Sequence, residues 1–438
     1  MKKIRILSLC LCLALTASAC GAASGGAGSQ PSSSSQSQSQ SSTPEGSDDA
    51  SDSGRKAPEA NTKIIFNSAA SVEGEGAEAN GGTVTITGAG VYSVSGSTTD
   101  GRIIVQASDH DVTLVLDGAD ILSPEGPAIL FQEAGEALVW VAGGSSNTLE
   151  DGGSSEDYDG ALYSCVSLTI DGSGSLEVTG TREEGIASEE HLTIDGGVIR
   201  VTAKDDGLNA NHDGVSLITI NGGELTVLAG GDGIDSNGSM EMNGGTVISM
   251  ASLDDMSGGI DVDGDFVIGG GTLVATGVMN ALPSESSSQQ SLSLTYKTAQ
   301  AAGTQARILL DGEELMAVSP EKEYKTLLFS SPGVTDGAYD VWAGETQQTH
   351  KDAGTAGEFA AAGALTRFSS VTYLEDTDFV EDSMGGPRGE RGPRPGVEGG
   401  TPPDGERPEP PKRPEDGSAP PDAVSGATPE GEEESAAL

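Results

Sequence analysis

A repeat with a period in the twenties runs through the middle of the chain and sets the narrowest limit on its fold. Each copy holds a glycine marker, a short strand, a turn of the Gly-Gly type and a second short strand. The second turn carries an equivalent glycine in every copy: Gly172, Gly196, Gly222, Gly244 and Gly270. Such a period without a helix-length pattern is typical of a solenoid, in which each copy forms one rung.

The repeat predicts an all-β fold, a right-handed parallel β-helix. Its rungs stack about 4.8 Å apart, so that equivalent residues form columns along the axis. Ile, Val and Leu fill the inward columns, and no rung can bury its apolar side alone. Leucine-rich repeats share the period but need a Leu/Asn consensus that is absent. A β-sandwich with regular hairpins is the alternative, but it does not explain why the same residue types recur at the same position of each rung.

The charge of the chain limits its partners. The 438 residues carry a formal net charge of −46, and aromatic residues make up only 4% of them. Repulsion of this size argues against nucleic acid, or a bare anionic membrane surface, as a partner. Divalent cations, or a ligand reached through them, are compatible with it.

The N-terminus, "MKKIRILSLCLCLALTASACG", has a basic start, an apolar stretch and small residues before Cys20, which together indicate a secretory signal. The small residues before Cys20 resemble the lipobox of bacterial lipoproteins, although Ala17 stands where that motif usually has Leu. The resemblance implies cleavage before Cys20 and a lipid on its thiol. An ordinary signal peptide cut nearby is the alternative. We expect an exported, membrane-anchored lipoprotein on the bacterial cell surface.

Changes of composition divide the chain into segments. The expected segments are a lipoprotein signal peptide (1–20), a disordered Ser/Gln-rich tether (21–61), the parallel β-helix (62–280), a C-terminal β segment (281–375) and a disordered Pro/Gly/Glu-rich tail (376–438). The C-terminal β segment is expected to cap the last rung, because an open rung is an exposed sheet edge. Once the signal is removed with Cys10 and Cys12, Cys165 has no partner for an intrachain disulfide.

Two nearly identical strings, "KDDGLNANHDG" from Lys204 and "GGDGIDSNG" from Gly230, lie one repeat apart. When the glycine-marked corners are stacked, with Gly160 over Gly185 and therefore Ala161 over Ile186, oxygen-bearing side chains on either side of the inward position form two outward columns. One column holds Asp159, Glu184, Asp206 and Asp232, and the other holds Asn209, Asp235 and Asp261, with Asn211, Asn237 and Asp263 two residues further on.

Like charges stacked in register repel one another and destabilise the ladder, unless protonation or a cation offsets the repulsion. Calcium takes six to eight oxygen ligands from carboxylates, amides and carbonyls, and we predict calcium as the cofactor. The predicted ligands are Asp205, Asp206, Asn209, Asp232, Asp235, Asn237, Asp254, Asp255 and Asp261. Turn chemistry is the alternative, because Asp and Asn side chains bond nearby backbone at tight turns. His191 and His212 sit on different strings, and no Cys/His cluster suggests zinc.

The strings "DDGLNAN" and "GGDGIDSNG", with the repeated "LTIDGG", "ITINGG" and "MEMNGGTV", resemble the clostridial cellulose- and pectin-binding parallel β-helix proteins, a family of carbohydrate-binding domain-containing proteins. The resemblance covers about residues 62–375 and is most specific over 159–277. It implies a right-handed parallel β-helix related to polysaccharide lyases, calcium along one side, and binding of cellulose and acidic sugars without established cleavage. The calcium ligands it implies lie among Asp205, Asp206, Asn209, Asp232, Asp235 and Asp261.

The expected function is therefore calcium-dependent, non-catalytic binding of plant cell-wall polysaccharide at the cell surface, by a monomer. Calcium would reverse the local sign of charge and share its open positions with the carboxylates of polygalacturonate. Cellulose is less favoured than acidic sugars, because few aromatic residues could stack on sugar rings. The candidates for stacking are Trp140, Tyr158 and Tyr163, and burial in the protein is the alternative for each.

Two other functions stay open. A calcium-dependent pectate lyase needs a Lys or Arg base beside the metal, and among Arg182, Arg200 and Lys204 the best candidate is Lys204, directly before the Asp doublet. The alternative for Lys204 is a surface lysine that relieves local repulsion. The third possibility is a structural surface stalk, in which calcium only stiffens the solenoid.

Overall fold

The computed structural model describes residues 56–152, 158–254, 256–335, 339–344, 346–347 and 371–375. These residues form strands and turns, and no helix occurs among them. Accordingly, the described part of the chain contains no helix long and apolar enough to cross a membrane. The signal sequence with Cys20, residues 21–55 of the proposed tether, the proposed tail and Asp255 lie outside the described residues.

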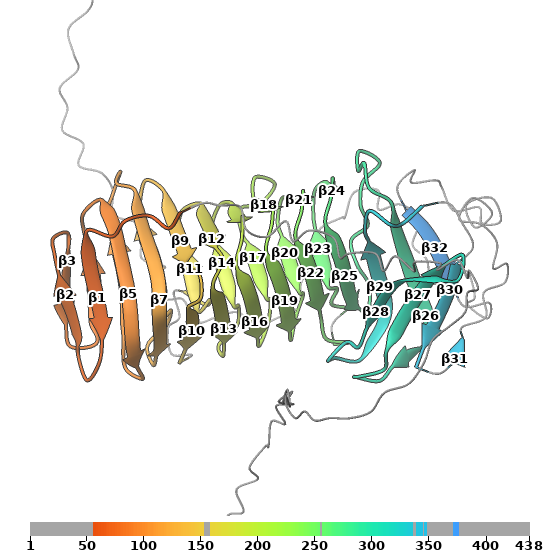
Figure 1. Cartoon of the computed structure of the whole chain (residues 1–438), viewed down its shortest axis with the longest axis horizontal. Coiled ribbons are helices and arrows are strands. Elements are labelled where there is room, and N and C mark those ends of the chain that lie inside the picture. Colours follow the sequence, from red (N-terminus) through yellow and green to blue (C-terminus); the bar gives the residue numbers. More distant parts are fainter. Residues whose placement is uncertain are drawn as a thin grey trace, which may run out of the picture. The chain divides into compact units, whose positions relative to one another are not determined.

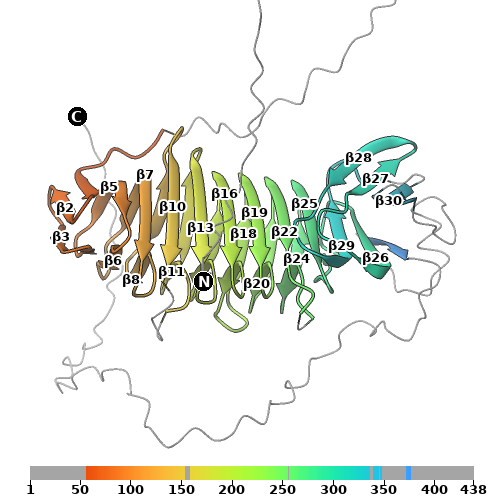
Figure 2. The same ribbon diagram turned by 90° about the horizontal axis from the view of Figure 1, so that it is seen from below.

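The strands stack in parallel into three faces (Figures 1 and 2), which confirms the all-β parallel β-helix. The first face consists of β4 (Thr83–Ile86), β6 (Arg102–Gln106), β8 (Ile129–Glu133), β11 (Leu162–Ser164), β14 (Ile186–Ser188), β17 (Leu208–Ala210), β20 (Ile234–Ser236) and β23 (Ile260–Val262). The second face contains β9 (Ala137–Val141), β12 (Leu168–Gly172), β15 (Leu192–Ile194), β18 (Leu217–Ile220), β21 (Ser239–Met242) and β24 (Phe266–Ile268). The third face contains β10 (Ser146–Asp151), β13 (Ser175–Gly180), β16 (Val198–Ala203), β19 (Glu224–Ala229), β22 (Thr246–Met250) and β25 (Thr272–Gly277).

In the first rungs, one long strand contributes to both the second and the third face. In β7 (Val112–Ser123), residues 112–116 pair with β9, and residues 120–123 pair with β10. The strand bends between these stretches at Gly118, whose φ is 80°. A positive φ is accessible to glycine without a Cβ clash, so this glycine turns one strand into two faces. The strand β5 (Gly90–Thr98) stacks on β7 and has a positive φ of 89° at Gly96.

The core consists of inward columns that run the length of the stack. Leu162, Ile186, Leu208, Ile234 and Ile260 pair in register through the first face and are all fully buried. Each such side chain contributes about 1.5–3 kcal/mol by leaving water. Because strand side chains alternate, a slip of one residue would expose a whole column, so these columns fix the register of every residue at the corners.

A glycine stands directly before four of these inward residues, where the third face turns into the first. A Cβ on Gly207 would lie 2.1 Å from a methyl carbon of Val227 and 2.5 Å from the carbonyl oxygen of Gly233. Gly185, Gly233 and Gly259 meet comparably close neighbours. These glycines are therefore required by close approach between rungs.

We expect Gly207→Ala to lower the free energy of unfolding by about 1–3 kcal/mol, because the added methyl must displace the backbone of the next rung. Gly269→Ala is the matched control, since its nearest neighbour to an added Cβ is 3.4 Å away. Thermal and urea unfolding of the two variants measure the difference. Equal stability of both variants would contradict the tight corner.

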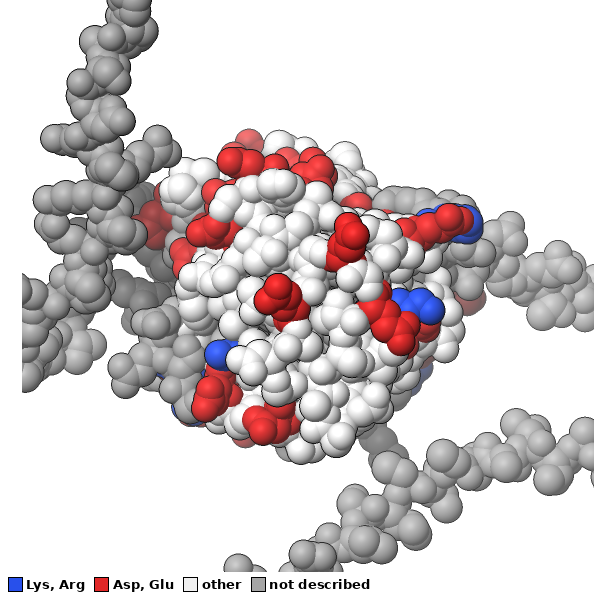
Figure 3. Space-filling model, turned by 90° about the vertical axis from the view of Figure 1, so that its left-hand side faces the viewer, with Lys and Arg blue, Asp and Glu red and all other residues white. Residues whose placement is uncertain are grey.

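Short β segments close both ends of the stack. At the N-terminal end, β1 (Thr62–Phe66) pairs in parallel with β5 and antiparallel with β2 (Ala70–Glu73), and β3 (Ala77–Asn80) pairs antiparallel with β4. Acidic side chains are scattered over this end (Figure 3), including the exposed Glu73 and Glu78 of β2 and β3. Charge on an edge strand discourages another chain from pairing with it.

At the C-terminal end, β29 (Tyr324–Ser330) pairs antiparallel with β25 and covers the last strand of the third face. It also pairs with β26 (Ser291–Gln300), which pairs in parallel with β32 (Val371–Glu375). A second sheet holds β28 (Glu313–Val318), β27 (Ala306–Leu310), β30 (Tyr339–Ala343) and β31 (Thr346–Gln347), in that order. The rings of Tyr296 and Tyr324 meet edge to face at 5.5 Å in a separate core for this segment.

Candidate functional site

The corner that joins the third face to the first gathers most of the acidic residues of the repeat. We define the acid corner as residues 158–160, 181–185, 204–207, 230–233 and 251–259, the last without the undescribed Asp255. Backbone bonds fix the register: Glu184 donates to the Asp159 carbonyl, and Ala161 donates to the Glu184 carbonyl. Gly160, Glu184, Asp206 and Asp232 therefore occupy one column, and Asp159, Glu183 and Asp205 occupy the column beside it.

This register corrects one expectation from the sequence. The sequence alignment placed Ala161 over Ile186 and therefore Asp159 over Glu184. In the structure it is Leu162 that pairs with Ile186, so Asp159 lies beside Glu183. The step between these rungs equals the step from Gly172 to Gly196. The shift places an acidic doublet, Glu183–Glu184, directly against Asp159. None of these three residues was among the predicted ligands, although Asp159 and Glu184 were placed in the acidic column.

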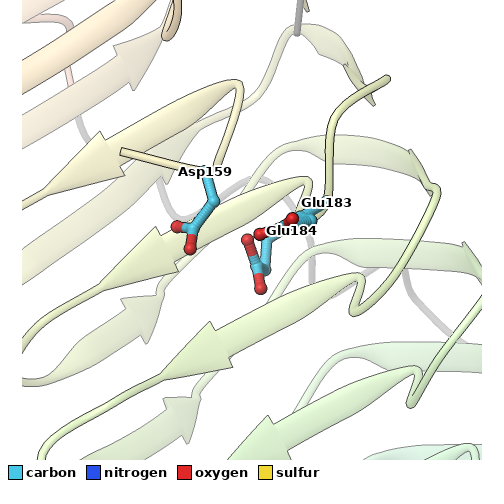
Figure 4. A group of neighbouring side chains, drawn as sticks. All are labelled: Asp159, Glu183 and Glu184. Atoms are coloured by element: carbon cyan, nitrogen blue, oxygen red, sulfur yellow. The ribbon is translucent and has the colours of Figure 1, made fainter. Parts of the chain in front are cut away.

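Asp159, Glu183 and Glu184 form a compact group of carboxylates. One ligand atom from each lies within 4.8 Å of the others, and Figure 4 shows the three side chains between neighbouring rungs. Arg182 is the neighbouring base, and its Nε is 4.0 Å from a Glu183 carboxylate oxygen. One guanidinium beside three carboxyl groups leaves the group with more acids than bases.

Three oxygen atoms are buried without a hydrogen-bond partner among the described residues: Asp159 Oδ1 and Glu184 Oε2 in the acid corner, and Asn209 Oδ1 beside it on β17. Only 8% of Glu184 and 7% of Asn209 is exposed. Burying a polar atom without a partner costs about 1–3 kcal/mol, and more for a charged group. These atoms are all hard oxygen ligands of the kind that calcium and magnesium prefer, and two of them belong to the close group of Asp159, Glu183 and Glu184, which could hold a cation.

The next two rungs satisfy their acids differently. Asp206 Oδ1 accepts a hydrogen bond of 2.7 Å from the Asp232 backbone N–H, and Asp232 Oδ1 accepts one of 2.6 Å from the Gly258 N–H. Asn209 Nδ2 donates to Asp206 Oδ2 at 3.3 Å. Asp206 and Asp232 thus make the rung-to-rung backbone contacts that turn chemistry predicts.

Burial and mutual repulsion act on the pKa values of this corner. Burial raises the pKa of Glu184 to about 8, together with the charge of Asp159, a hydrogen bond that the protonated carboxyl shares with Asp159, and the charge of Asp206. Burial also raises the pKa of Asp206 to about 8, assisted by Asp235 and opposed by the Asp232 N–H. In the absence of a cation, both side chains are therefore substantially protonated near neutral pH.

At another corner, side-chain amides form a hydrogen-bonded ladder of a kind that carboxylates cannot form. Between the second and third faces, Asn221 Nδ2 donates to Asp195 Oδ1 at 2.8 Å, and Asn243 Nδ2 donates to Asn221 Oδ1 at 2.9 Å. An amide carries both a donor and an acceptor, so a stack of amides satisfies itself, whereas an ionised carboxylate can only accept. A stack of carboxylates therefore needs protons, backbone donors or a cation.

The structure places the other predicted ligands on two further columns. Asn209, Asp235 and Asp261 pair in register on β17, β20 and β23, with Asp235 and Asp261 half-buried. Asn237 lies after β20 at the far end of the first face, and its amide donates to the Asn211 carbonyl at 3.0 Å. Asp205 and Asp254 are exposed at the acid corner. The predicted residues therefore share one face but do not all share one site.

Two lysines, Lys204 and Lys322, lie at the acid corner. The sequence analysis pointed only to Lys204. Lys204 is exposed, and its backbone N–H donates to the Gly180 carbonyl. Lys322 comes from the C-terminal β segment, and its ammonium donates to the Ala229 carbonyl at the end of β19. Nothing in the repeat could have pointed to Lys322, because it lies outside the repeat and reaches the corner only through tertiary folding.

The opposite edge of the first face has an open hollow of about 450 Å³ lined by Cys165, Glu189, Glu190, Asn211, His212 and Asp213. Burial raises the pKa of the Cys165 thiol to about 11, which keeps it protonated and unreactive. Glu189 accepts a hydrogen bond from the Tyr163 hydroxyl. His191 is engaged elsewhere, since its Nδ1 accepts from the Leu217 N–H at 3.1 Å.

The aromatic residues near these sites are mostly packed inside the protein. Only 7% of Trp140 and 3% of Tyr163 is exposed. Tyr158 is half-buried and meets Tyr163 edge to face at 5.2 Å between ring centroids. Neither Trp140 nor Tyr163 offers an open ring for a sugar to stack on.

The stacked rungs and the oxygen-rich corner define a parallel β-helix that displays repeated polar positions along one side. A family model described as "Carbohydrate-binding domain-containing protein" matches residues 80–318, which is more than half of the 438 residues. The chain belongs to this carbohydrate-binding family, which confirms the resemblance seen in the sequence.

Two similar proteins come from clostridia. A carbohydrate-binding domain-containing protein of Acetivibrio thermocellus is 32% identical over 161 residues, which are 34% of this chain and 56% of that protein. This chain thus spans about half the length of that relative. A solved structure of a polysaccharide lyase-like protein from C. thermocellum, a gadolinium derivative, is 27% identical, covers 51% of this chain and 94% of that chain, and has a TM-score of 0.44.

The raised pKa of Glu184 predicts a pH dependence of stability. Folding raises this pKa from about 4.5 to about 8, so its contribution is full below pH 4.5 and is lost as the pH rises through 8. In EGTA, we expect the free energy of unfolding to fall between about pH 5 and pH 8 and the Glu184→Gln variant to show a shallower fall. Thermal unfolding followed by circular dichroism across this range measures it.

The control for this measurement is Glu177→Gln, which removes an exposed carboxylate from the third face and should keep the wild-type profile. Asp206 acts in the same direction, so Glu184→Gln should remove only part of the slope. An unchanged slope in Glu184→Gln would show that this carboxyl is not protonated by folding.

Proposed function

We propose that the protein is an exported lipoprotein that binds acidic plant cell-wall polysaccharide through calcium ions at the acid corner, without cleaving it. The observation that carries this proposal is the close group of the Asp159, Glu183 and Glu184 carboxylates, in which Asp159 and Glu184 each bury an oxygen that receives no donor from the described residues. The family supplies the class of ligand, and the corner supplies the means to reach an anionic one.

The donor set suits a hard divalent cation. Asp159, Glu183, Glu184 and the Asn209 amide would hold it, and Asp206 lies one rung further on. The excess of carboxylates lowers the electrostatic energy of a bound cation. Asp159 and Glu183 are only half-buried, so a ligand could reach a cation held there. A bound calcium ion would supply positive charge and open coordination positions for sugar carboxylates. The predicted ligands Asp205, Asp232, Asp235 and Asp261 extend the same face along the axis.

The nature of the polymer follows from charge and from the absence of open rings at Trp140 and Tyr163. A chain with a net charge of −46 repels polygalacturonate in solution, and a corner loaded with cations reverses that repulsion locally. Cellulose lacks carboxylates, and its binding usually relies on sugar rings stacked on exposed aromatic faces. Both aromatic side chains are buried. Polygalacturonate is therefore the polymer that this face suits best.

We expect purified mature protein to be retained on polygalacturonate in calcium and released by EGTA. The double variant Asp159→Asn/Glu184→Gln should lose most of the retention, because it removes two charges from the cation-binding group. Glu177→Gln on the third face changes a comparable charge away from the corner and should bind like wild type. Affinity electrophoresis in polygalacturonate gels measures all three proteins.

The same assay separates this proposal from a structural stalk. If calcium raises the melting temperature but leaves the protein free of polygalacturonate, the ions only stiffen the solenoid. If EGTA changes neither the melting temperature nor retention, the acid corner does not hold calcium.

A lyase is the second candidate, and the position of Lys204 next to Asp205 in the acid corner favours it. Elimination requires a base that removes the proton beside the uronate carboxylate. Our proposal of a non-catalytic binder predicts no rise in the ultraviolet absorbance of unsaturated uronates when polygalacturonate and calcium are added. A rise that Lys204→Ala abolishes would establish the lyase instead.

A further inference from the structure

The turn between β28 and β29, residues 319–323, contacts three consecutive rungs of the third face. Glu321 forms an ion pair of 3.0 Å with Arg200 on β16, and its backbone N–H donates to Met250 Sδ on β22 at 3.2 Å. Between them, the Lys322 ammonium donates to the Ala229 carbonyl on β19. The turn is thus positioned by contacts on both sides of Lys322.

These contacts bring the Lys322 ammonium to the acid corner. Ala229 is the last residue of β19 and lies three residues before Asp232. The lysine side chain is half-buried, and burial lowers its pKa while the charge of Asp254 opposes that change. An ammonium has three donors, and the Ala229 carbonyl takes one of them.

We infer that Lys322 is a specificity-determining residue whose ammonium binds a carboxylate of the polysaccharide, two to three rungs from the cation held by Asp159, Glu183 and Glu184. This inference rests on the proposed function. With rungs about 4.8 Å apart, the two positive centres are separated by roughly 10–14 Å along the axis. A polyuronate lying along the corner would meet calcium at one end and the ammonium at the other.

Asp254 is the acidic neighbour that favours the charged form of Lys322 in the protein, and holding the turn in place does not require that charge. Glu321 already ties the turn to β16 and β22, so the turn has two attachments besides the bond from Lys322 to the Ala229 carbonyl. Partly burying an ammonium costs free energy, which an arriving carboxylate would offset. A neutral glucan has no such group and gains nothing from Lys322, so the lysine favours acidic polymers over neutral ones.

The length of the ligand provides the test. A digalacturonate is too short to span from the carboxylate group to Lys322, whereas a hexagalacturonate is long enough. In calcium, we expect Lys322→Gln to weaken hexagalacturonate binding about fivefold, the upper range for a partly exposed ion pair, and to leave digalacturonate binding unchanged. Lys322→Arg should keep at least half of the wild-type affinity for the hexamer. Isothermal titration calorimetry of the full mature chain measures both ligands.

Lys63→Gln is the matched control, because it removes an exposed ammonium from β1 at the far end of the stack. Equal weakening of both oligomers in Lys322→Gln, or no weakening of either, would overturn the inference while leaving the proposed function intact. If wild-type protein binds neither oligomer in calcium, the proposed function fails and the role of Lys322 fails with it.

Discussion

In the stacked rungs, each corner residue lies about 4.8 Å from the residue at the equivalent position of the next rung. This constraint decides which side chains a column can hold. Leucine and isoleucine stack on themselves and close the core, as in the column from Leu162 to Ile260. Asparagine also stacks on itself, since its amide both donates and accepts, as Asn221 and Asn243 do. Carboxylates have no such self-complementary arrangement, so a column of them always depends on a third group.

The acid corner solves this problem in different ways along its length. At Asp159 and Glu184, buried oxygens have no hydrogen-bond partner among the described residues. At Asp206 and Asp232, the backbone of the following rung donates to the carboxylate. Further on, the C-terminal β segment brings the Lys322 ammonium to the column. Among the described residues, the carboxylate oxygens that receive no donor are therefore concentrated on the rungs of Asp159 and Glu184.

The repeat was sufficient to predict the fold, because the period and the glycine spacing directly encode the stacking of rungs. The pairing of Leu208 with Ile234 and of Asn209 with Asp235 follows from the strings that begin at Lys204 and Gly230. The less regular rung before them was misaligned by one residue, because Ala161 and Leu162 are both apolar and either could point inward. The spacing between Gly172 and Gly196 equals that between Leu162 and Ile186, and so predicts the register that the structure shows.

The electrostatic character of the corner was less accessible from the sequence. Whether a carboxylate accepts a backbone N–H or stays unpartnered depends on fine differences of turn geometry, which residue type does not encode. Asp206 and Glu184 occupy equivalent positions, yet their surroundings differ. Lys322 depends on the docking of a segment that lies far along the chain from the first acidic rung. Local patterns carry no information about such long-range contacts.

The contacts of the turn at residues 319–323 also limit how this protein can change in length. Solenoids commonly grow or shrink by whole repeats, since each rung needs only its neighbours. Here Arg200, Ala229 and Met250 must stay on consecutive strands to meet one turn. A rung duplicated between β16 and β22 would separate these partners, whereas one inserted before β13 would leave them together. Such insertion would lengthen the stack without disturbing the register at its C-terminal end, so natural size variation should occur on the N-terminal side.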